Sequence, residues 1–413
     1  MNNSAGAFTP RLIAFVLAPF AAGYFLSYMF RAINAVVAPN LATELDLDAG
    51  QLGLVTAAYL IAFALFQLPL GMLLDRYGPR RVQTVLLTTA AIGATAFAMA
   101  ESALGLALAR ALIGLGFAGG LMAGFKAVVI WFAPARHALA NASIMSVGGL
   151  GMLAATLPAE YAVQTIGWRG LFYVSAGVTA AVAIGIYFIV PEREGELRTT
   201  SLKQQFADIK LIYSDRFFWR IAPLVALTSG AHVGIHTLWA GPWFRDIGGL
   251  DRDGVALYLL VIAVAFLVGT LGAGFVADRL GRRGVDAIHI MIVGLGLFML
   301  SQVAIIAELT IINPLMWTVF GMTGQLAMLA YPKLVQHFGV ELSGRAQTSM
   351  NLLLFAMAFF SQWVIGAILD LYPQSANQYA AEGYRSAFAA LLVAQVLALG
   401  WYFVSKAQPR GAS

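Results

Sequence analysis

Apolar stretches of about 20 residues or more alternate with short polar segments along nearly the whole chain. A helix needs about 20 mainly apolar residues to cross the hydrocarbon core of a bilayer. The pattern therefore predicts an all-α membrane protein with twelve spans. These cover 12–38, 51–74, 81–100, 103–132, 138–163, 169–190, 217–244, 254–277, 285–307, 309–336, 343–369 and 384–405.

The longest polar stretch lies between the sixth and seventh predicted spans. It divides the chain into an N-terminal six-helix bundle (1–190), a cytoplasmic linker (191–215) and a C-terminal six-helix bundle (216–413). The first apolar stretch is too long for a signal-peptide core and is interrupted by Arg31, so no cleavable signal is expected.

Composition supports the membrane interpretation. Of the 413 residues 60% are hydrophobic and 11% are charged, whereas soluble proteins carry about 25% charged residues. The chain has no Cys, which excludes disulfides and thiolate metal sites. Its net charge of +5 does not point to nucleic acid, because most basic residues flank apolar spans.

The distribution of Lys and Arg predicts the orientation. With the N-terminus inside, 17 of the 25 basic residues fall in cytoplasmic segments and four fall on the opposite side. Membrane proteins show this excess of basic residues on the cytoplasmic side. We therefore expect a multi-pass protein of the cell inner membrane with both termini in the cytoplasm.

A ten-residue loop occurs twice. The segment 71–80 (GMLLDRYGPR) recurs as 274–283 (GFVADRLGRR), at an offset of 203 residues. A repeat of half the chain predicts two similar six-helix halves, with the substrate site where the halves meet.

The doubled loop, together with Arg110-x-x-x-Gly114 in the fourth span, resembles the major facilitator superfamily. The resemblance implies a secondary transporter with twelve helices in two pseudo-symmetric bundles, and a loop that latches the outward-facing form. A loop of solvated charges that only sets topology is the alternative. The residues that the resemblance assigns to gating are Gly71, Asp75, Arg76, Gly78, Arg80, Asp278 and Arg279.

Four basic residues fall inside predicted spans, namely Arg31, Arg110, Lys126 and Lys333, and no Asp or Glu lies comparably deep. Each buried cation costs about 2.5–3.5 kcal/mol on insertion scales. An anionic substrate, carrying a carboxylate or a phosphate, would supply the missing partner through bidentate contacts. Cations are the least favoured cargo.

Each of these residues has a second interpretation. Lys333 lies near a helix end and can snorkel, and Arg110 can bind the first span structurally. For Lys126 the structural and the functional interpretations are equally favoured. For Arg31 a functional role is favoured, since an Arg here resembles the anion-binding residue of organic-anion porters. Asn34 and Tyr28 are expected beside it.

His232 and His236 lie one helical turn apart in the seventh span and share a face. Three interpretations are open: a proton-coupling site, neutral hydrogen bonding, and a metal site. The metal site is the least favoured, since no Cys, Asp or Glu is near in sequence. Proton coupling is attractive because His titrates near neutral pH.

The fifth predicted span is rich in small residues, which permits close helix crossing, and Pro158 permits a bend. It lacks the Gly-Pro pair that drug exporters of the family carry in this helix.

The sequence thus predicts a proton-coupled transporter of a small organic anion that works by alternating access. The alternatives are an exporter of amphipathic compounds and a non-transporting receptor or assembly factor. No nucleophile–base pair, phosphate loop or metal cluster suggests an enzyme. The expected partners are the substrate, the proton and the lipid bilayer, with no cofactor, metal or nucleic acid, and the expected state is a monomer.

Overall fold

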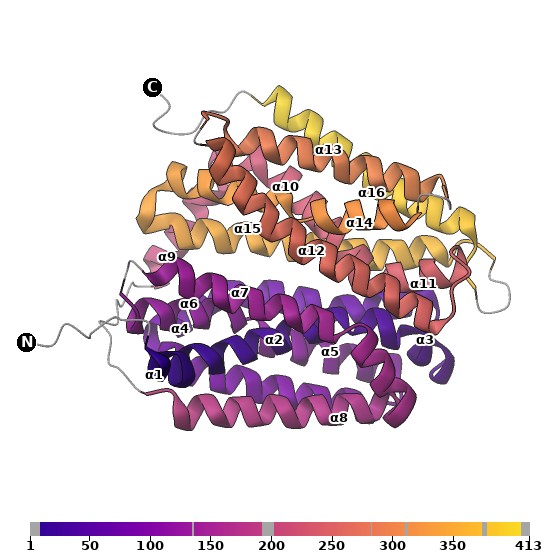
Figure 1. The fold of residues 1–413 in the computed structure, drawn as a ribbon, viewed down its shortest axis with the longest axis horizontal. Helices are drawn as coiled ribbons and strands as arrows, with labels where there is room; N and C mark the ends of the chain where they lie inside the picture. The colour runs from indigo at the N-terminus through magenta and orange to yellow at the C-terminus, as the bar shows by residue number, and fades with distance from the viewer. Residues whose placement is uncertain are drawn as a thin grey trace, which may run out of the picture. The chain divides into compact units, whose positions relative to one another are not determined.

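The computed structural model describes residues 9–133, 136–191, 202–281, 283–309, 313–373 and 378–405. Every element assigned within these residues is helical (Figure 1), which confirms the predicted all-α fold. Up to residue 191 the elements are α1 (Pro10–Leu12), η1 (Ile13–Leu17), α2 (Ala18–Ala32), α3 (Asn34–Glu44), α4 (Ala49–Met99), α5 (Ala103–Phe117), α6 (Gly120–Trp131), α7 (His137–Ala154) and α8 (Leu157–Ile189). From residue 202 they are α9 (Leu202–Tyr213), α10 (Arg216–Gly234), η3 (Ile235–Trp239), α11 (Ala240–Asp246), α12 (Arg252–Gly281), α13 (Ala287–Ile306), α14 (Asn313–Thr323), η5 (Leu326–Ala330), α15 (Tyr331–Leu369) and α16 (Ala381–Val404).

Ten helical segments of the described chain are long and apolar enough to cross a membrane. The predicted span 138–163 is not among them, because the helix breaks between α7 and α8, where Pro158 occupies the first turn of α8. Its longest part, Leu139–Ala154, is a shorter apolar helix. The predicted span 309–336 is divided between α14, η5 and the start of α15. The count of twelve therefore stays a prediction.

Three glycines break long helices where the sequence predicts loops. Gly78 interrupts α4 with φ 76° and ψ 162°, Gly167 interrupts α8 with φ 71° and ψ 165°, and Gly339 interrupts α15 with φ 74° and ψ 171°. Residues with a side chain rarely adopt positive φ. A Cβ at Gly78 would meet no atom within 4 Å, so the backbone angle, and not space, requires glycine there. The turn between the second and third predicted spans therefore depends on glycine.

The chain forms two compact units. Unit one contains Met1–Asn40 and Ala58–Thr200, and unit two contains Leu41–Ala57 and Ser201–Ser413. The division near residue 200 falls inside the predicted linker 191–215, of which 192–201 lie outside the described residues. The first turns of α4 belong to unit two and the rest of that helix to unit one.

In unit one, small residues bring helices into backbone contact. A Cβ at Gly151 of α7 would lie 2.0 Å from the carbonyl oxygen of Phe25 in α2, and one at Gly114 of α5 would lie 2.1 Å from that of Tyr59 in α4. Real Cβ atoms never approach so closely, so neither position accepts even alanine without a shift of the backbone. The close crossing predicted for the fifth span is confirmed.

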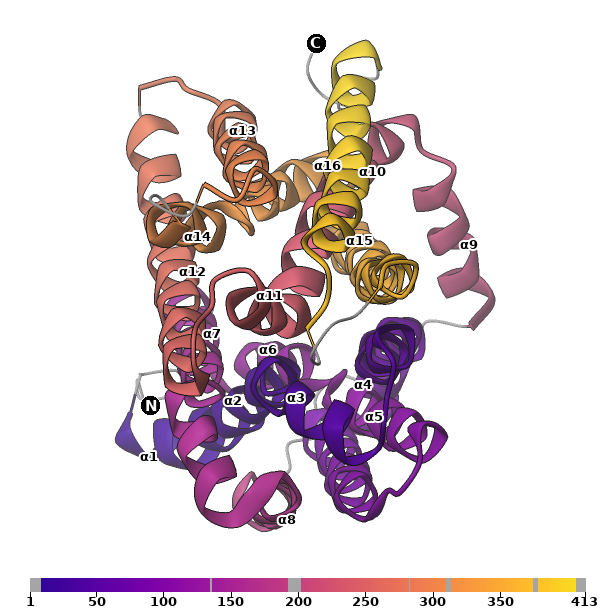
Figure 2. The ribbon, with the colours of Figure 1, turned by 90° about the vertical axis from the view of Figure 1, so that its right-hand side faces the viewer.

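Unit two is built around one central helical rod. In the most apolar stretch of 18 residues within 216–246, 89% of the residues are buried, whereas in the corresponding stretch of α16 22% are buried. Figure 2 shows α11, the continuation of this rod, between α12 on one side and α15 and α16 on the other. The rod includes the short π-helical segment η3, a distortion that is frequent at functional sites. Polar groups on it lie in the interior of the unit.

Asp215 caps the start of this rod. Its Oδ1 accepts hydrogen bonds from the backbone N–H groups of Phe217 (2.8 Å) and Phe218 (3.0 Å), and its Oδ2 lies 3.0 Å from Nε2 of His337. The ring of His337 also stacks on that of Phe217, with centroids 4.4 Å apart. Burial alone would raise the pKa of Asp215, but these hydrogen bonds and the His337 charge outweigh it and lower that pKa.

We expect Asp215→Ala to lower the free energy of unfolding by about 1–2 kcal/mol, because a helix cap and a partly buried partner are lost together. The lowered pKa means that the ionised form stabilises the native state above the ordinary pKa of an aspartate, about 4. That contribution is lost as the pH falls below about 4 and Asp215 becomes protonated in the native state. Thermal unfolding in detergent at pH 7 and at pH 3 measures both effects, and equal destabilisation at the two pH values would contradict the assignment.

Candidate functional site

Arg31 lies on α2 among aromatic side chains of unit one. Its guanidinium carbon is 4.7 Å from the ring centroid of Tyr28 and 5.0 Å from that of Phe63 on α4. Tyr59 stacks on Phe63 with ring centroids 6.1 Å apart, lies beside Arg31, and donates its hydroxyl to the carbonyl of Ser27 at 3.3 Å. Tyr24 packs edge-on against Tyr28 at 5.1 Å. We call Tyr24, Tyr28, Tyr59 and Phe63 the aromatic cage.

The aromatic cage places uncharged rings around the half-buried guanidinium of Arg31. A cation over an aromatic face gains about 0.5–2 kcal/mol, which offsets part of the cost of removing it from water. Phenol and phenyl rings do not neutralise its charge at neutral pH. Of the predicted neighbours, Tyr28 is part of the cage, whereas Tyr59 and Phe63 were not identified from sequence.

Arg110 of α5 contacts the same part of α2 that carries Arg31. It is fully buried, with its guanidinium 4.9 Å from the ring of Phe97 and 5.4 Å from that of Phe172. Its Nη1 donates a 3.1 Å hydrogen bond to the carbonyl of Phe30, the residue before Arg31. This geometry favours the structural interpretation of Arg110, in which it positions Arg31 and does not itself contact substrate.

Two further polar groups lie on the α2–α3 segment. Asn34 is 3% exposed and Ser27 is 1% exposed. Within the described residues, Oδ1 of Asn34 and Oγ of Ser27 have no hydrogen-bond partner. They stand three and four residues from Arg31 and so share its side of the helix. The third predicted cation of unit one, Lys126, is half-buried on α6.

In unit two, His232 of α10 lies in a closed aromatic box. Its ring is fully buried and its centroid is 5.1 Å from that of Phe320, 5.9 Å from Phe266 and 6.0 Å from Phe298. A Cβ at Gly324 would lie 1.9 Å from the His232 ring, so only glycine at this position leaves room for the side chain. Gly324 lies between α14 and η5, inside the predicted span 309–336.

The two histidines contact each other directly. Their ring centroids are 4.5 Å apart, and Nδ1 of His236 lies 2.7 Å from the carbonyl oxygen of His232. A carbonyl only accepts, so Nδ1 of His236 carries the proton and Nε2 carries the lone pair. The amide of Gln325 lies 3.3 Å from Nδ1 of His232, whose Nε2 has no hydrogen-bond partner within the described residues.

Directly after this pair, hydrogen bonds join η3 to α15. Nε2 of Gln362 in α15 donates to Oγ1 of Thr237 at 2.8 Å, and the carbonyl of Gln362 accepts from the indole N–H of Trp239 at 3.0 Å. All three residues are buried. As to the third interpretation of the histidines, the described residues contain no group of three or more His, Cys, Asp or Glu that could hold a metal ion.

The first gating loop is partly described. Arg80 donates from Nε to the carbonyl of Tyr187 at the end of α8 (2.8 Å) and lies over its ring. The exposed Arg76 lies 5.3 Å from the ring of Tyr77, and nothing would obstruct a Cβ at Gly71.

The acidic residues of the two gating loops cannot be placed. The side chains of Asp75 and Asp278 lie outside the described part of the structure. Arg279, next to Asp278 in the second loop, is exposed. The latch role of these loops therefore stays a prediction.

The structure supports the second interpretation of Lys333, as a cation near a helix end. Its Nζ lies 2.7 Å from Oδ2 of Asp286, in the segment between α12 and α13. The break at Gly339 lies within two helical turns of Lys333, so this residue is close to a helix end and reaches a loop carboxylate.

One buried carboxylate was missed. Asp246, at the end of α11, has a fully buried side chain that lies 2.5 Å from Nε of Arg245. It also accepts hydrogen bonds from the backbone N–H of Tyr379 (3.2 Å) and the hydroxyl of Tyr384 (2.8 Å). Its burial was not predictable from sequence, because it depends on the tertiary contacts with Tyr379 and with Tyr384 of α16.

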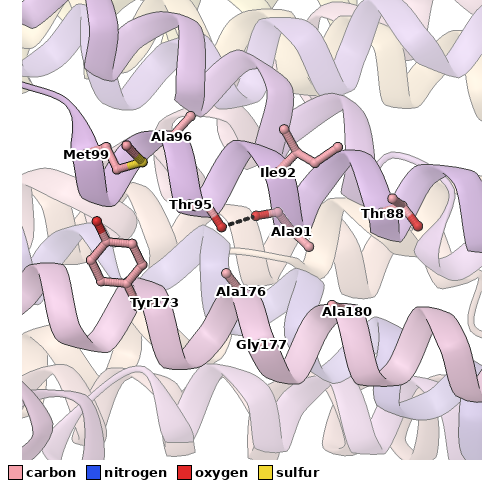
Figure 3. A pocket seen from close by; sticks show the side chains of 10 residues that line it. All are labelled: Thr88, Ala91, Ile92, Thr95, Ala96, Met99, Tyr173, Ala176, Gly177 and Ala180. Carbon is pink, nitrogen blue, oxygen red and sulfur yellow. Dashed lines mark hydrogen bonds between the residues drawn. The ribbon is translucent and has the colours of Figure 1, made fainter.

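A shallow groove runs between α4 and α8 on unit one, and Figure 3 shows its lining of small and apolar side chains. Thr95 bonds back to the carbonyl of Ala91 at 3.0 Å, which leaves its hydroxyl satisfied within its own helix. Tyr173 is its one ionisable side chain, and none of the predicted substrate-binding residues lines it. The groove is therefore separate from the aromatic cage and from the histidine pair.

Comparison with known proteins identifies related sequences. The sequence profile described as Major Facilitator Superfamily matches residues 20–362. The chain is 25% identical over 275 residues to the probable sulfoacetate transporter SauU of Cupriavidus necator, covering 63% of this chain and 64% of the relative. It is 28% identical over 269 residues to the cis,cis-muconate transport protein of Acinetobacter baylyi, covering 62% of each. The aligned regions thus span slightly less than two thirds of these relatives.

Solved structures show the same fold. A D-xylose–proton symporter superimposes with a TM-score of 0.78 at 16% identity, over 97% of this chain and 99% of the other. A bacterial homologue of the human lysosomal transporter Spinster, in an inward-facing and unoccupied conformation, gives a TM-score of 0.76 at 17% identity, over 97% and 98%.

Proposed function

Because the chain belongs to the Major Facilitator Superfamily, and is a membrane transporter and not an enzyme, we propose that it carries a small organic anion by alternating access, in symport with protons. The proposed location is the inner membrane, with both termini in the cytoplasm and a monomer as the working unit. The observation that carries the proposal is the guanidinium of Arg31 in its neutral aromatic cage.

The aromatic cage suits the recognition of an anionic group. A guanidinium presents its N–H donors in its own plane, and a carboxylate or sulfonate can accept two of them side by side. Rings that contact the faces of Arg31 leave this edge as the natural place for a ligand.

Related proteins support an organic anion. The names of the relatives include transporters of sulfoacetate, cis,cis-muconate, L-galactonate and hexuronate. Each of these substrates is a small organic molecule with at least one acidic group. We propose the same class for this chain.

The buried oxygens of Asn34 and Ser27 narrow this class. A buried polar oxygen without a hydrogen bond costs about 1–3 kcal/mol, and a substrate hydroxyl could supply the missing donor. Both residues share the side of the helix that carries Arg31. The proposed substrate is therefore an acid that carries hydroxyl groups near its anionic group, as sugar acids do.

His232 and His236 are the proposed proton-coupling pair. Two imidazoles in contact, buried in one helix, cannot both carry a positive charge without a large electrostatic cost. The pair therefore takes up at most one proton beyond its neutral form, and the arrival or departure of that proton changes the hydrogen bonds to Gln325 and to the helix backbone. The gating loops at 71–80 and 274–283 are the proposed latch of the outward-facing form.

Thermal-shift screening of the purified protein tests the substrate class. We expect glucuronate and galactonate to raise the unfolding temperature more than cis,cis-muconate or sulfoacetate at equal concentration. We expect glucosamine and glucose, as cationic and neutral counterparts, to leave it unchanged. Stabilisation by glucosamine equal to that by glucuronate would reject an anionic site, and a preference for cis,cis-muconate would reject the role given to Asn34 and Ser27.

A further inference from the structure

The N-terminal end of α4 is held by a residue 320 positions away in sequence. The first N–H groups of a helix have no partner inside it and need acceptors from elsewhere. Asp370, directly after the end of α15, supplies both of its carboxylate oxygens. Oδ1 accepts from the N–H of Ala49 at 2.9 Å and Oδ2 from that of Gly50 at 2.5 Å. A carboxylate at a helix N-terminus also gains from the helix dipole.

The two helices approach to backbone contact beside this cap. A Cβ at Gly366 of α15 would lie 2.4 Å from the carbonyl oxygen of Ala49, and one at Gly53 of α4 would lie 2.8 Å from that of Gln362. Figure 2 shows the start of α4 next to α15. We call Ala49, Gly50, Gly53, Gly366 and Asp370 the α4–α15 clamp, and all of it lies within unit two.

The α4–α15 clamp is also anchored to the central rod of unit two. The carbonyl of Gln362, which faces Gly53, accepts the hydrogen bond of Trp239, and the Trp239 ring lies 3.5 Å from a Cβ placed on Gly53. The same turn of α15 is therefore tied to η3, directly after His236. From Ala58 onward, however, α4 belongs to unit one. The clamp thus fixes to unit two the end of a helix whose remainder belongs to the other unit.

Two features of the contact lower the free energy needed to break it. Asp48 and Gln51 form their own local cap: Oδ1 of Asp48 accepts from the N–H of Gln51 at 2.6 Å, and Oε1 of Gln51 accepts from the N–H of Asp48 at 3.3 Å. This capping box keeps the helix end intact if Asp370 leaves. Asp370 is exposed, so water can replace its hydrogen bonds.

A second negative charge limits the strength of the clamp. Partial desolvation and the nearby Asp48 charge raise the pKa of Asp370, against the effect of its two backbone hydrogen bonds. The ionised Asp370 is therefore held less firmly than the two hydrogen bonds alone would hold it. A contact of moderate strength suits a device that opens and closes.

We propose that the α4–α15 clamp is a reversible latch, in which Asp370 holds the start of α4 on unit two in the conformation of this structure and releases it in another state of the transport cycle. This rests on the proposed alternating access, since only a transporter whose units move needs such a release. The latch lies on the predicted outer side, opposite to the loops at 71–80 and 274–283.

The absence of Cys from the chain allows a direct test. Ala49 is fully buried in the clamp, whereas Thr43, just before it, is exposed. A cysteine introduced by Ala49→Cys should react slowly with a soluble maleimide in purified protein, and one introduced by Thr43→Cys should react fast. Adding Asp370→Ala should raise the rate at the first position about fivefold or more, the range expected when a helix cap is lost. The rate at the second position should not change.

Two further variants separate the latch from general loosening. Asp48→Asn removes one charge from the same helix end but keeps a capping oxygen, so it should not raise labelling of the Ala49→Cys protein. Gly366→Ala should raise it without touching Asp370, because the added methyl group cannot fit against Ala49. If Asp370→Ala proves unstable, the Gly366→Ala variant decides the question.

Unchanged labelling of the Ala49→Cys protein in both Asp370→Ala and Gly366→Ala would overturn the latch. The measurement uses no substrate, so its outcome is independent of whether the cargo is an anion. A failed anion screen with increased labelling would reject the proposed cargo and keep the latch.

Discussion

Arg31→Gln is expected to reduce uptake of the preferred organic acid by roughly 30-fold to several thousandfold. Removal of one partner of a desolvated charge pair costs about 2–5 kcal/mol, and each 1.4 kcal/mol corresponds to about tenfold. The substitution leaves the aromatic cage in place but removes its positive charge. Uptake into proteoliposomes, with glucuronate, cis,cis-muconate and sulfoacetate as labelled probes, measures the effect.

Two controls define what the Arg31 result means. Arg31→Lys keeps the charge but loses the planar fork, so an intermediate loss is expected. Arg252→Gln removes an exposed Arg at the start of α12 and should leave uptake within about twofold of the unmodified protein, the range of ordinary surface substitutions. Wild-type uptake by Arg31→Gln, at equal protein in the membrane, would exclude a direct role in binding.

Replacement of both histidines, His232→Gln with His236→Gln, is expected to abolish the pH dependence of uptake between about pH 5.5 and 8. Imidazole is the side chain whose charge normally changes in this range, and the amide of Gln can still hydrogen-bond but cannot titrate. The prediction is that uptake no longer accelerates when a proton gradient is applied, whereas exchange of substrate without a gradient continues.

The exposed His289 at the start of α13 provides the matched control for the histidine pair. His289→Gln should keep the pH profile of the unmodified protein. If the double variant at His232 and His236 also kept it, the coupling group would lie elsewhere, and the buried carboxylate of Asp246 would be the next residue to test.

The fold was largely predictable because the bilayer restricts what a spanning segment can be. Apolar length and the placement of Lys and Arg require no knowledge of tertiary contacts, and neither does the turn at Gly78, whose conformation follows from the residue type. The close approach of the His232 ring to Gly324 inside the segment 309–336 was not predictable, because it is a contact with another helix.

Several residues of the candidate site could be identified from the sequence, but the role of each could not. Arg31, Arg110 and the two histidines stand out in sequence because charged and titratable groups are rare in spans. Only the structure distinguishes the roles of the two arginines. Arg110 donates a hydrogen bond to the Phe30 carbonyl, whereas Arg31 lies in an aromatic cage. Tyr59 and Phe63 gave no signal, since aromatic residues are common in apolar spans. Likewise Asp370 seemed an ordinary helix-end acid until its contact with Ala49 and Gly50 was visible.

If Arg31 selects the charge of the cargo, an acid and its uncharged amide must differ in equilibrium binding. Glucuronate and glucuronamide differ in that one group, and their dissociation constants can be compared by calorimetry for the unmodified protein and for Arg31→Gln. We expect the unmodified protein to prefer the acid by about 30-fold or more and the variant to show no preference. An equal preference for the acid in both proteins would contradict it.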